Sequence, residues 1–209
     1  MKDNDNNISR RSFARRGSLA LAAGFFAPFP AGAMRPAPVE RVAMFQEAGP
    51  KGVVCLICPN ECTLKDGELS DCHNRIARKS KLYTMAFGNP CAVNTDPVEK
   101  KPLYHFLPGT TAFSIATAGC NLACLNCQNW TISQTSPDKT RNFDLLPPDV
   151  VAQAAAGGCR SIAYTYSEPV TFYEYVYETS RLAREKGIKN IMVSNGYINR
   201  EPLRQLCRY

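Results

Sequence analysis

Two observations predict an α/β fold for the C-terminal half of this chain. Three short apolar, β-branched segments have the composition of buried strands: 111–118, 161–166 and 189–193. A segment with the length and end signals of a helix follows each of them: 147–156, 170–186 and 200–209. Strands alternating with helices are typical of a parallel sheet with right-handed crossovers. We therefore expect about three βα units over residues 111–209.

The helix signals are those of helix ends. Pro147 and Pro148 stand where proline is tolerated, at the first helical positions. Gly187 supplies a stop for the second helix, because glycine accepts the left-handed conformation that often ends a helix. Asn199 precedes the third segment and is expected to cap it.

Three cysteines directly follow the first predicted strand, after Gly119. Cys120, Cys124 and Cys127 have the spacing C-x3-C-x2-C, and the next cysteine, Cys159, is distant. Structural zinc normally takes four ligands, whereas three thiolates on a four-iron cluster leave one iron free to bind a small molecule. The spacing thus favours an iron–sulfur cluster at a strand end, where βα barrels place their active sites. A zinc site with a distant fourth ligand, or three unligated buried cysteines, are the alternatives.

A second set of cysteines lies nearer the N-terminus, with the spacing C-x2-C-x3-C-x9-C. Its four members are Cys55, Cys58, Cys62 and Cys72. Four thiolates can close a zinc or an iron–sulfur site, and the residues leave both metals open. A closed site indicates a structural or electron-transfer role. Two disulfides, or His73 in place of Cys72, are the alternatives.

Residues 1–33 have the order of a twin-arginine signal peptide. The basic segment 9–15 contains Arg10 and Arg11, the apolar segment 19–29 is too short to span a bilayer, and residues 31–33 read Ala-Gly-Ala. This pattern predicts export to the periplasm; an accidental arginine pair before a core helix is the alternative.

Residues 1–18 carry five Lys or Arg and two Asp, so the rest of the chain holds +4 of the net charge of +7. That charge is too small to indicate nucleic-acid binding, and the basic residues of 75–81 are expected to form a solvated face.

The cysteine loop resembles that of the radical S-adenosylmethionine (SAM) enzymes, which reads C-x3-C-x-aromatic-C, although Asn126 stands here at the aromatic position. The longer run from Asp96 to Gly109, continuing through Cys127-Gln128-Asn129-Trp130, is similar to the AmmeMemoRadiSam system radical SAM enzymes. These are relatives of pyruvate formate-lyase-activating enzyme. The resemblance covers residues 53–209 and includes the second cysteine set.

This resemblance implies a partial TIM-like radical SAM barrel of which the chain supplies the N-terminal half. The expected organisation is a signal peptide at 1–33, a cysteine-rich metal-binding extension at 34–110 and the first half of the core domain at 111–209. A full catalytic domain of the family has six units, so we expect a C-terminally truncated chain that alone is a poor enzyme.

The resemblance also implies cofactor residues at the other strand ends. Ser167 and Glu168 lie where the family often reads G-G-E-P and binds the amino group of SAM. Asn195 lies in a stretch similar to D-T-N-G, with Val193 at the place of the acid. The alternatives are a helix N-terminal carboxylate for Glu168 and a simple turn at Asn195.

The implied activity is that of an iron–sulfur oxidoreductase. Cys120, Cys124 and Cys127 would hold a [4Fe–4S] cluster, and reductive cleavage of SAM would generate a 5′-deoxyadenosyl radical. An external electron donor is required, activation of a glycyl-radical enzyme is the related activity, and the substrate, a protein among the candidates, is not identified. SAM and low-potential reductants are cytoplasmic, which makes a cytoplasmic location the alternative to export. An exported iron–sulfur electron-transfer protein and a zinc-stabilised binding module are the rival functions.

Overall fold

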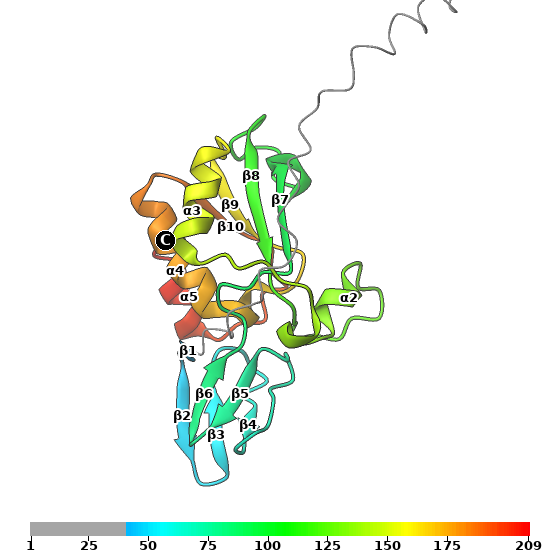
Figure 1. Cartoon of the computed structure of the whole chain (residues 1–209), viewed down its shortest axis with the longest axis vertical. Coiled ribbons are helices and arrows are strands. Elements are labelled where there is room, and N and C mark those ends of the chain that lie inside the picture. Colours follow the sequence, from blue (N-terminus) through cyan, green and yellow to red (C-terminus); the bar gives the residue numbers. More distant parts are fainter. Residues whose placement is uncertain (1–40) are drawn as a thin grey trace, which may run out of the picture. The chain divides into compact units, whose positions relative to one another are not determined.

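The computed structural model of the protein describes residues 41–209, all of which belong to one compact unit (Figure 1). The expected signal peptide at 1–33 and the first residues of the expected extension lie outside the described residues. Within the described part, no helix has both the length and the apolar character needed to cross a membrane.

A four-stranded sheet with the order β10-β9-β8-β7 forms the centre of the C-terminal half. The parallel strands β8 (Thr111–Ala116), β9 (Ser161–Tyr164) and β10 (Lys189–Met192) confirm the three predicted strands, each with a shorter C-terminal end. Strand β7 (Ala92–Pro97) pairs antiparallel with β8, in the register Ala92 to Ala116. The structure therefore shows part of a parallel sheet with an antiparallel neighbour.

Three helices match the predicted helical segments: α3 (Pro147–Ala156), α4 (Tyr173–Glu185) and α5 (Arg200–Leu206). A 3₁₀ turn, η3 (Pro169–Phe172), replaces the first turn expected of α4. Asn199 is the N-cap of α5, but its side chain makes no cap hydrogen bond and instead donates to the carbonyl of Leu56, 3.0 Å away. Three short elements were not predicted: η1 (Val98–Lys100), α2 (Trp130–Ser133) and η2 (Pro137–Lys139).

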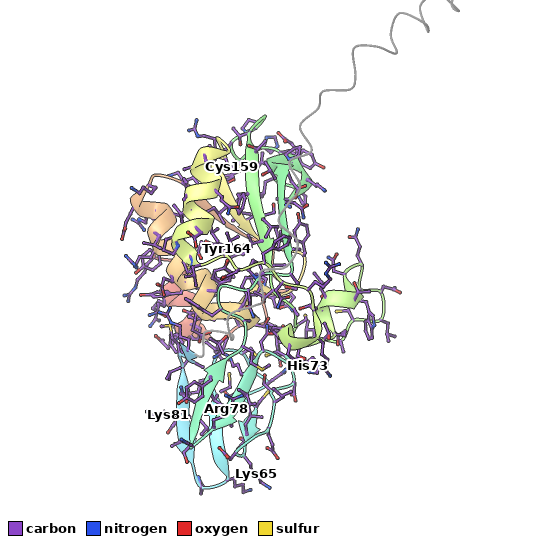
Figure 2. The ribbon with its side chains drawn as sticks, in the orientation of Figure 1. Lys65, His73, Arg78, Lys81, Cys159 and Tyr164 are labelled. Carbon is purple, nitrogen blue, oxygen red and sulfur yellow. The ribbon has the colours of Figure 1, made fainter. Side chains whose placement is uncertain are left out.

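The two faces of the four-stranded sheet carry different side chains. One face packs large residues such as Phe113, Ile115 and Tyr164 against α3 and α4. Figure 2 shows Tyr164 in the middle of this layer. The other face is lined by a smaller apolar cluster that includes Ala112 and Ala163. This second cluster also contains Val98 and Ile191, and Leu103 packs against it.

Two antiparallel three-stranded sheets make up the N-terminal region. The first has the order β1 (Arg41–Val42), β6 (Lys81–Thr84), β5 (Arg75–Arg78), and the second the order β2 (Gln46–Gly49), β3 (Gly52–Cys55), β4 (Thr63–Leu64). Figure 1 shows them as a group of strands separate from the four-stranded sheet. The four cysteines of the second set lie in or beside these sheets.

A buried ion pair joins the N-terminal region to α4. The guanidinium of Arg75 binds both carboxylate oxygens of Glu174, at 3.0 and 3.1 Å, and both side chains are 1% exposed. Burial opposes the charge, but the Glu174 carboxylate more than compensates and raises the pKa of Arg75. The expectation that the basic residues of 75–81 form a solvated face is therefore wrong for Arg75. Glu174 also accepts from the backbone N–H of Met44 at 2.7 Å, so one carboxylate fixes two parts of the N-terminal region.

Candidate active site

The loops that follow β8, β9 and β10 meet at one edge of the sheet, because the carboxyl ends of parallel strands share an edge. The cysteine loop follows β8, the loop with Ser167 and Glu168 follows β9, and the loop with Asn195 follows β10. The predicted cysteines and the predicted cofactor residues therefore lie on neighbouring segments.

The cysteine loop begins at a tightly packed glycine. Gly119 has a φ of +100°, and a Cβ added there would lie 2.4 Å from the carbonyl oxygen of Cys72. Its N–H donates to the carbonyl of Ile132 at 2.8 Å. Only glycine fits both the backbone conformation and the space, so the residue before Cys120 packs directly against the second cysteine set.

Asn121 connects three segments from inside the cysteine loop. Its side-chain amide donates to the carbonyl of Tyr197 at 2.8 Å, and its side-chain oxygen accepts from the side chain of Asn195 at 2.9 Å. Its backbone carbonyl accepts from the side chain of Asn60, between Cys58 and Cys62, at 3.2 Å. Sequence reasoning missed Asn121, and the only signal was its position next to Cys120.

Two side-chain amides hold the cysteine loop, one just after its last cysteine and one near its first. Asn129, the N-cap residue of α2, donates to the carbonyl of Tyr166 at 2.8 Å. Gln134, at the end of α2, donates to the carbonyl of Leu122 at 2.8 Å. Figure 1 shows α2 and its connecting loops set off to one side of the sheet. The loop is therefore fixed at its beginning and at its end.

The middle of the loop is open to solvent. Cys124 is exposed, Cys120 and Cys127 are half-buried, and Leu125 between them is 97% exposed. Burial raises the pKa of Cys120, and the nearby groups Glu168, Cys124 and Cys127 raise it further, against a backbone N–H from Leu122 that lowers it.

The cysteine loop has the donor set of a three-thiolate cluster. Among residues 41–209, no three His, Cys, Asp or Glu side chains are gathered as closely as a bound metal ion requires. Cys124 lies in the exposed middle of a loop that is anchored at both ends. Three soft thiolates suit iron–sulfur chemistry, so the residues fit a cluster with one iron free of protein ligands.

Glu168 is 4% exposed and makes three hydrogen bonds through its carboxylate. One oxygen accepts from the N–H of Val170 at 3.0 Å, which caps η3, and from the hydroxyl of Ser194 at 2.7 Å. The other accepts from the N–H of Asn195 at 2.8 Å. The capping role that was the alternative for Glu168 is present, together with a link to the loop after β10. A carboxylate offers about four acceptor positions, so about one remains for a further donor.

Ser167 and Asn195 also join neighbouring loops. The hydroxyl of Ser167 donates to the carbonyl of Thr117, just before the cysteine loop, at 2.6 Å. Asn195 donates through its side chain to Asn121 and accepts from the N–H of Tyr197 at 2.8 Å. Glu168 and Asn195 thus share a hydrogen-bonded network with Asn121, whereas Ser167 separately ties the loop after β9 to the segment before the cysteine loop. Ser194, which the sequence placed beside Asn195 without a role, is a direct partner of Glu168.

The second cysteine set is more enclosed. Cys55, Cys58 and Cys72 are buried and Cys62 is half-buried. Burial raises the pKa of Cys62 to about 12 and that of Cys72 to about 11. These thiols are protonated at neutral pH in the metal-free protein, and metal binding would have to displace the protons. His73, labelled in Figure 2, adopts a φ of +63° in the turn after Cys72.

The three remaining cysteines belong to neither set. Cys159 is buried beside Thr111 at the start of β8, the opposite end of that strand from the cysteine loop (Figure 2). Cys91 is half-buried and Cys207 is exposed. Cys159 is thus distant from the cysteine loop, whereas the backbone N–H of Cys91 donates to the carbonyl of Ala116 at 2.8 Å, at the same end of β8 as that loop.

Comparison with known families gives the superfamily that the sheet and its loops match. Residues 114–209, which begin in β8 and include the cysteine loop, Glu168 and Asn195, match the model of the Radical SAM superfamily. This part of the chain is a radical SAM domain. Members of the superfamily are enzymes, and the family implies a [4Fe–4S] cluster and SAM.

A curated relative extends the similarity toward the N-terminus. The chain is 47% identical over 167 residues to the uncharacterized protein MJ0808 of Methanocaldococcus jannaschii. The alignment covers 79% of this chain and 50% of that protein. The chain therefore spans about half the length of the relative that it matches. A match of this length includes more than the 96 residues of the radical SAM domain match.

Proposed function

We propose that this chain holds a [4Fe–4S] cluster on Cys120, Cys124 and Cys127 and takes part in the reductive cleavage of SAM. The observation that carries the proposal is the three-cysteine loop at the carboxyl edge of a parallel sheet, inside a radical SAM domain. When bound, the cluster supplies the electron that splits SAM into methionine and a 5′-deoxyadenosyl radical. The residues around the cluster would have to bind and orient SAM.

In this proposal the polar network beside the loop receives the methionine part of SAM. Glu168 has acceptor capacity left after its three hydrogen bonds, and it can meet an ammonium group. Ser167 and Asn195 hold the flanking loops against Thr117 and Asn121, and thereby fix the distance between Glu168 and the cysteines. The network is largely formed before a ligand arrives, which lowers the ordering cost of binding.

The second cysteine set is proposed as a separate metal site. Its four members, Cys55, Cys58, Cys62 and Cys72, offer the closed donor set of zinc or of an iron–sulfur cluster. The contact of Gly119 with Cys72 and of Asn60 with Asn121 supports a role in holding the cysteine loop. Metal and sulfide analysis after anaerobic purification distinguishes zinc from iron.

The finer activity proposed is that of an activating enzyme for a glycyl-radical partner, on the resemblance of residues 96–130 to that group. It needs an external electron donor and a protein substrate, and the exposed middle of the cysteine loop supports access by a partner. The twin-arginine pattern at residues 9–15 supports export, and with it the rival function of an exported iron–sulfur electron carrier.

Electron paramagnetic resonance (EPR) of the anaerobically reconstituted, reduced protein tests the proposal. A [4Fe–4S]⁺ signal that shifts when SAM is added would establish an iron open to SAM. A cluster signal indifferent to SAM would overturn SAM cleavage and favour the electron carrier. Zinc without iron or sulfide would overturn both and favour a zinc-stabilised binding module. Because the chain spans about half of its relative, the same measurement is made on a version extended to that relative's length.

A further inference from the structure

A buried polar cluster ties the loop after β9 to strand β7. The carboxylate of Asp96, on β7, accepts from Lys100 at 2.8 Å through one oxygen and from Lys101 at 2.7 Å through the other. The hydroxyl of Tyr166 donates to the second oxygen as well. Asp96 is 6% exposed and Lys101 is 5% exposed. Charged groups are rarely buried so deeply unless they are paired, and here each has its partner.

Tyr166 is held by its ring as well as by its hydroxyl. The ammonium of Lys101 lies 4.6 Å from the centroid of the Tyr166 ring, within the range of a cation–π contact. Burial and the nearby Asp96 carboxylate raise the pKa of Tyr166 to about 12, so the phenol stays protonated and donates over the neutral range. Burial opposes ionisation of Asp96, but Lys100, Lys101 and Tyr166 lower its pKa below the usual range. The ionised carboxylate of Asp96 therefore accepts hydrogen bonds from the ammonium of Lys101 and the protonated phenol of Tyr166.

The backbone of Tyr166 stands in a conformation that is usual for glycine. Its φ is +66°, in the left-handed region that costs a side chain steric energy. Its carbonyl accepts from Asn129, two positions after Cys127, and the next two residues are Ser167 and Glu168. An unfavourable backbone conformation persists only where its surroundings enforce it. The side chain of Tyr166 is held by its contacts with Asp96 and Lys101.

On the basis of the proposed function, we propose that Asp96 and Lys101 are positioning residues for SAM. They hold Tyr166 in its left-handed conformation and thereby set the backbone of Ser167 and Glu168 toward the amino group of the ligand. Tyr166 transmits this effect, because its side chain meets Asp96 and Lys101 while its backbone meets the cysteine loop. The cluster would then determine SAM affinity without touching SAM or the iron.

Two nearly isosteric substitutions isolate the cluster, and a third serves as the matched control. Asp96→Asn removes the charge, and Tyr166→Phe removes the hydroxyl. The control is Tyr164→Phe: Tyr164 is a fully buried tyrosine two positions away, whose hydroxyl binds Asn190 at 3.0 Å and Ser180 at 3.1 Å. It loses the same chemical group from the helix-facing core. If these residues served only general folding stability, all three variants would have similar effects.

Each variant is reconstituted with its cluster, and two quantities are measured. Hydrogen exchange of the peptide covering residues 165–172 is followed without SAM, and the Kd for SAM is taken from titration of the EPR shift. We expect Asp96→Asn and Tyr166→Phe to speed exchange at the Ser167 amide and to weaken SAM binding about tenfold each, the range of a hydrogen bond to a charged group. The double variant should lose less than a hundredfold, because both changes break one cluster. Tyr164→Phe should change neither quantity.

The outcomes separate this inference from the proposed function. If the unsubstituted protein gives no EPR shift with SAM, the proposed function is overturned, and the positioning role falls with it. If it gives the shift, but Asp96→Asn and Tyr166→Phe bind SAM as tightly as Tyr164→Phe does, only the positioning role is overturned. Unchanged hydrogen exchange at residues 165–168 in both cluster variants also overturns it. Equal iron content in all variants is the expected control, since none of the substituted residues is a proposed ligand.

Discussion

The two cysteine sets of this chain are close together but lie in opposite surroundings. The loop with Cys120, Cys124 and Cys127 is anchored at both ends and exposed in its middle. The set at residues 55–72 has three buried thiols in or beside two small sheets, and the ion pair of Arg75 with Glu174 ties these sheets to α4. Three thiols in an open loop suit a reacting site, and four enclosed thiols suit a structural or electron-transfer site.

The difference shows how one residue type can serve two purposes in one protein. A cluster that must bind a ligand needs an open position and access, and an exposed loop provides both at little cost to the fold. Its supports must then come from elsewhere. Here Gly119 and Asn121 connect the start of the open loop to Cys72 and Asn60 of the enclosed set. The enclosed region is therefore expected to stabilise the open one, and substitutions in the two regions should have different consequences.

The largest effect on chemistry with the smallest effect on folding is expected for Cys124→Ala. Cys124 is exposed, and surface substitutions usually change the free energy of unfolding by no more than about 0.5 kcal/mol. Loss of one of three thiolates should abolish the SAM-responsive EPR signal and the formation of 5′-deoxyadenosine. Cys207→Ala, at another exposed cysteine, is the control and should retain both. Normal 5′-deoxyadenosine formation by Cys124→Ala would contradict the ligand assignment.

The largest effect on stability is expected for Glu174→Gln. The change leaves the buried guanidinium of Arg75 without its counter-charge, and breaking a buried pair typically costs about 3–5 kcal/mol. Chemical denaturation of the protein measures this loss. The matched control is Glu185→Gln, which breaks the exposed pair with Arg181 on the same helix and should cost about 0.3–0.5 kcal/mol. Similar losses in the two variants would show that the buried pair does not hold the N-terminal region in place.

An intermediate effect is expected at the contact between the two regions. Gly119→Ala should destabilise the protein by roughly 2–3 kcal/mol, because the new Cβ meets the backbone of Cys72 as well as an unfavourable φ. Gly67→Ala has a similar φ of +83° but nothing within 4 Å of the new Cβ, and should cost about 1 kcal/mol. The difference between the two free energies of unfolding isolates the contact. If the two variants lose the same free energy of unfolding, packing of the cysteine loop against the enclosed set does not stabilise the protein.

The open site was easier to predict from the sequence than its supports. Strands β8, β9 and β10 are continuous apolar segments with local end signals, so the shared edge that carries the cysteines and Glu168 could be inferred. Strand β7 was missed because Asn94, Thr95 and Asp96 interrupt its apolar character. The strand forms through its pairing with β8, which its own sequence does not reveal. Arg75 was misassigned because its partner Glu174 is 99 positions away. The left-handed φ of Tyr166 was equally hidden, since it depends on the contacts of Tyr166 with Asp96 and Lys101.

The smallest predicted effect is a pH dependence of the free energy of unfolding, and it arises at Asp96, which supports the site of the open cysteine loop. The partners of Asp96 lower its pKa in the folded protein, whereas in the unfolded chain it titrates near its ordinary value of about 3.9. Its contribution to stability is therefore fully present above that value and is lost as the pH falls toward the lower folded pKa. The unfolding free energy of Asp96→Asn, measured between pH 6 and pH 2.5, should fall less steeply below about pH 4 than that of the unsubstituted protein. Parallel curves would show that the three donors do not stabilise the ionised carboxylate, and the anchor of Tyr166 would then have to be sought in its ring contact with Lys101 alone.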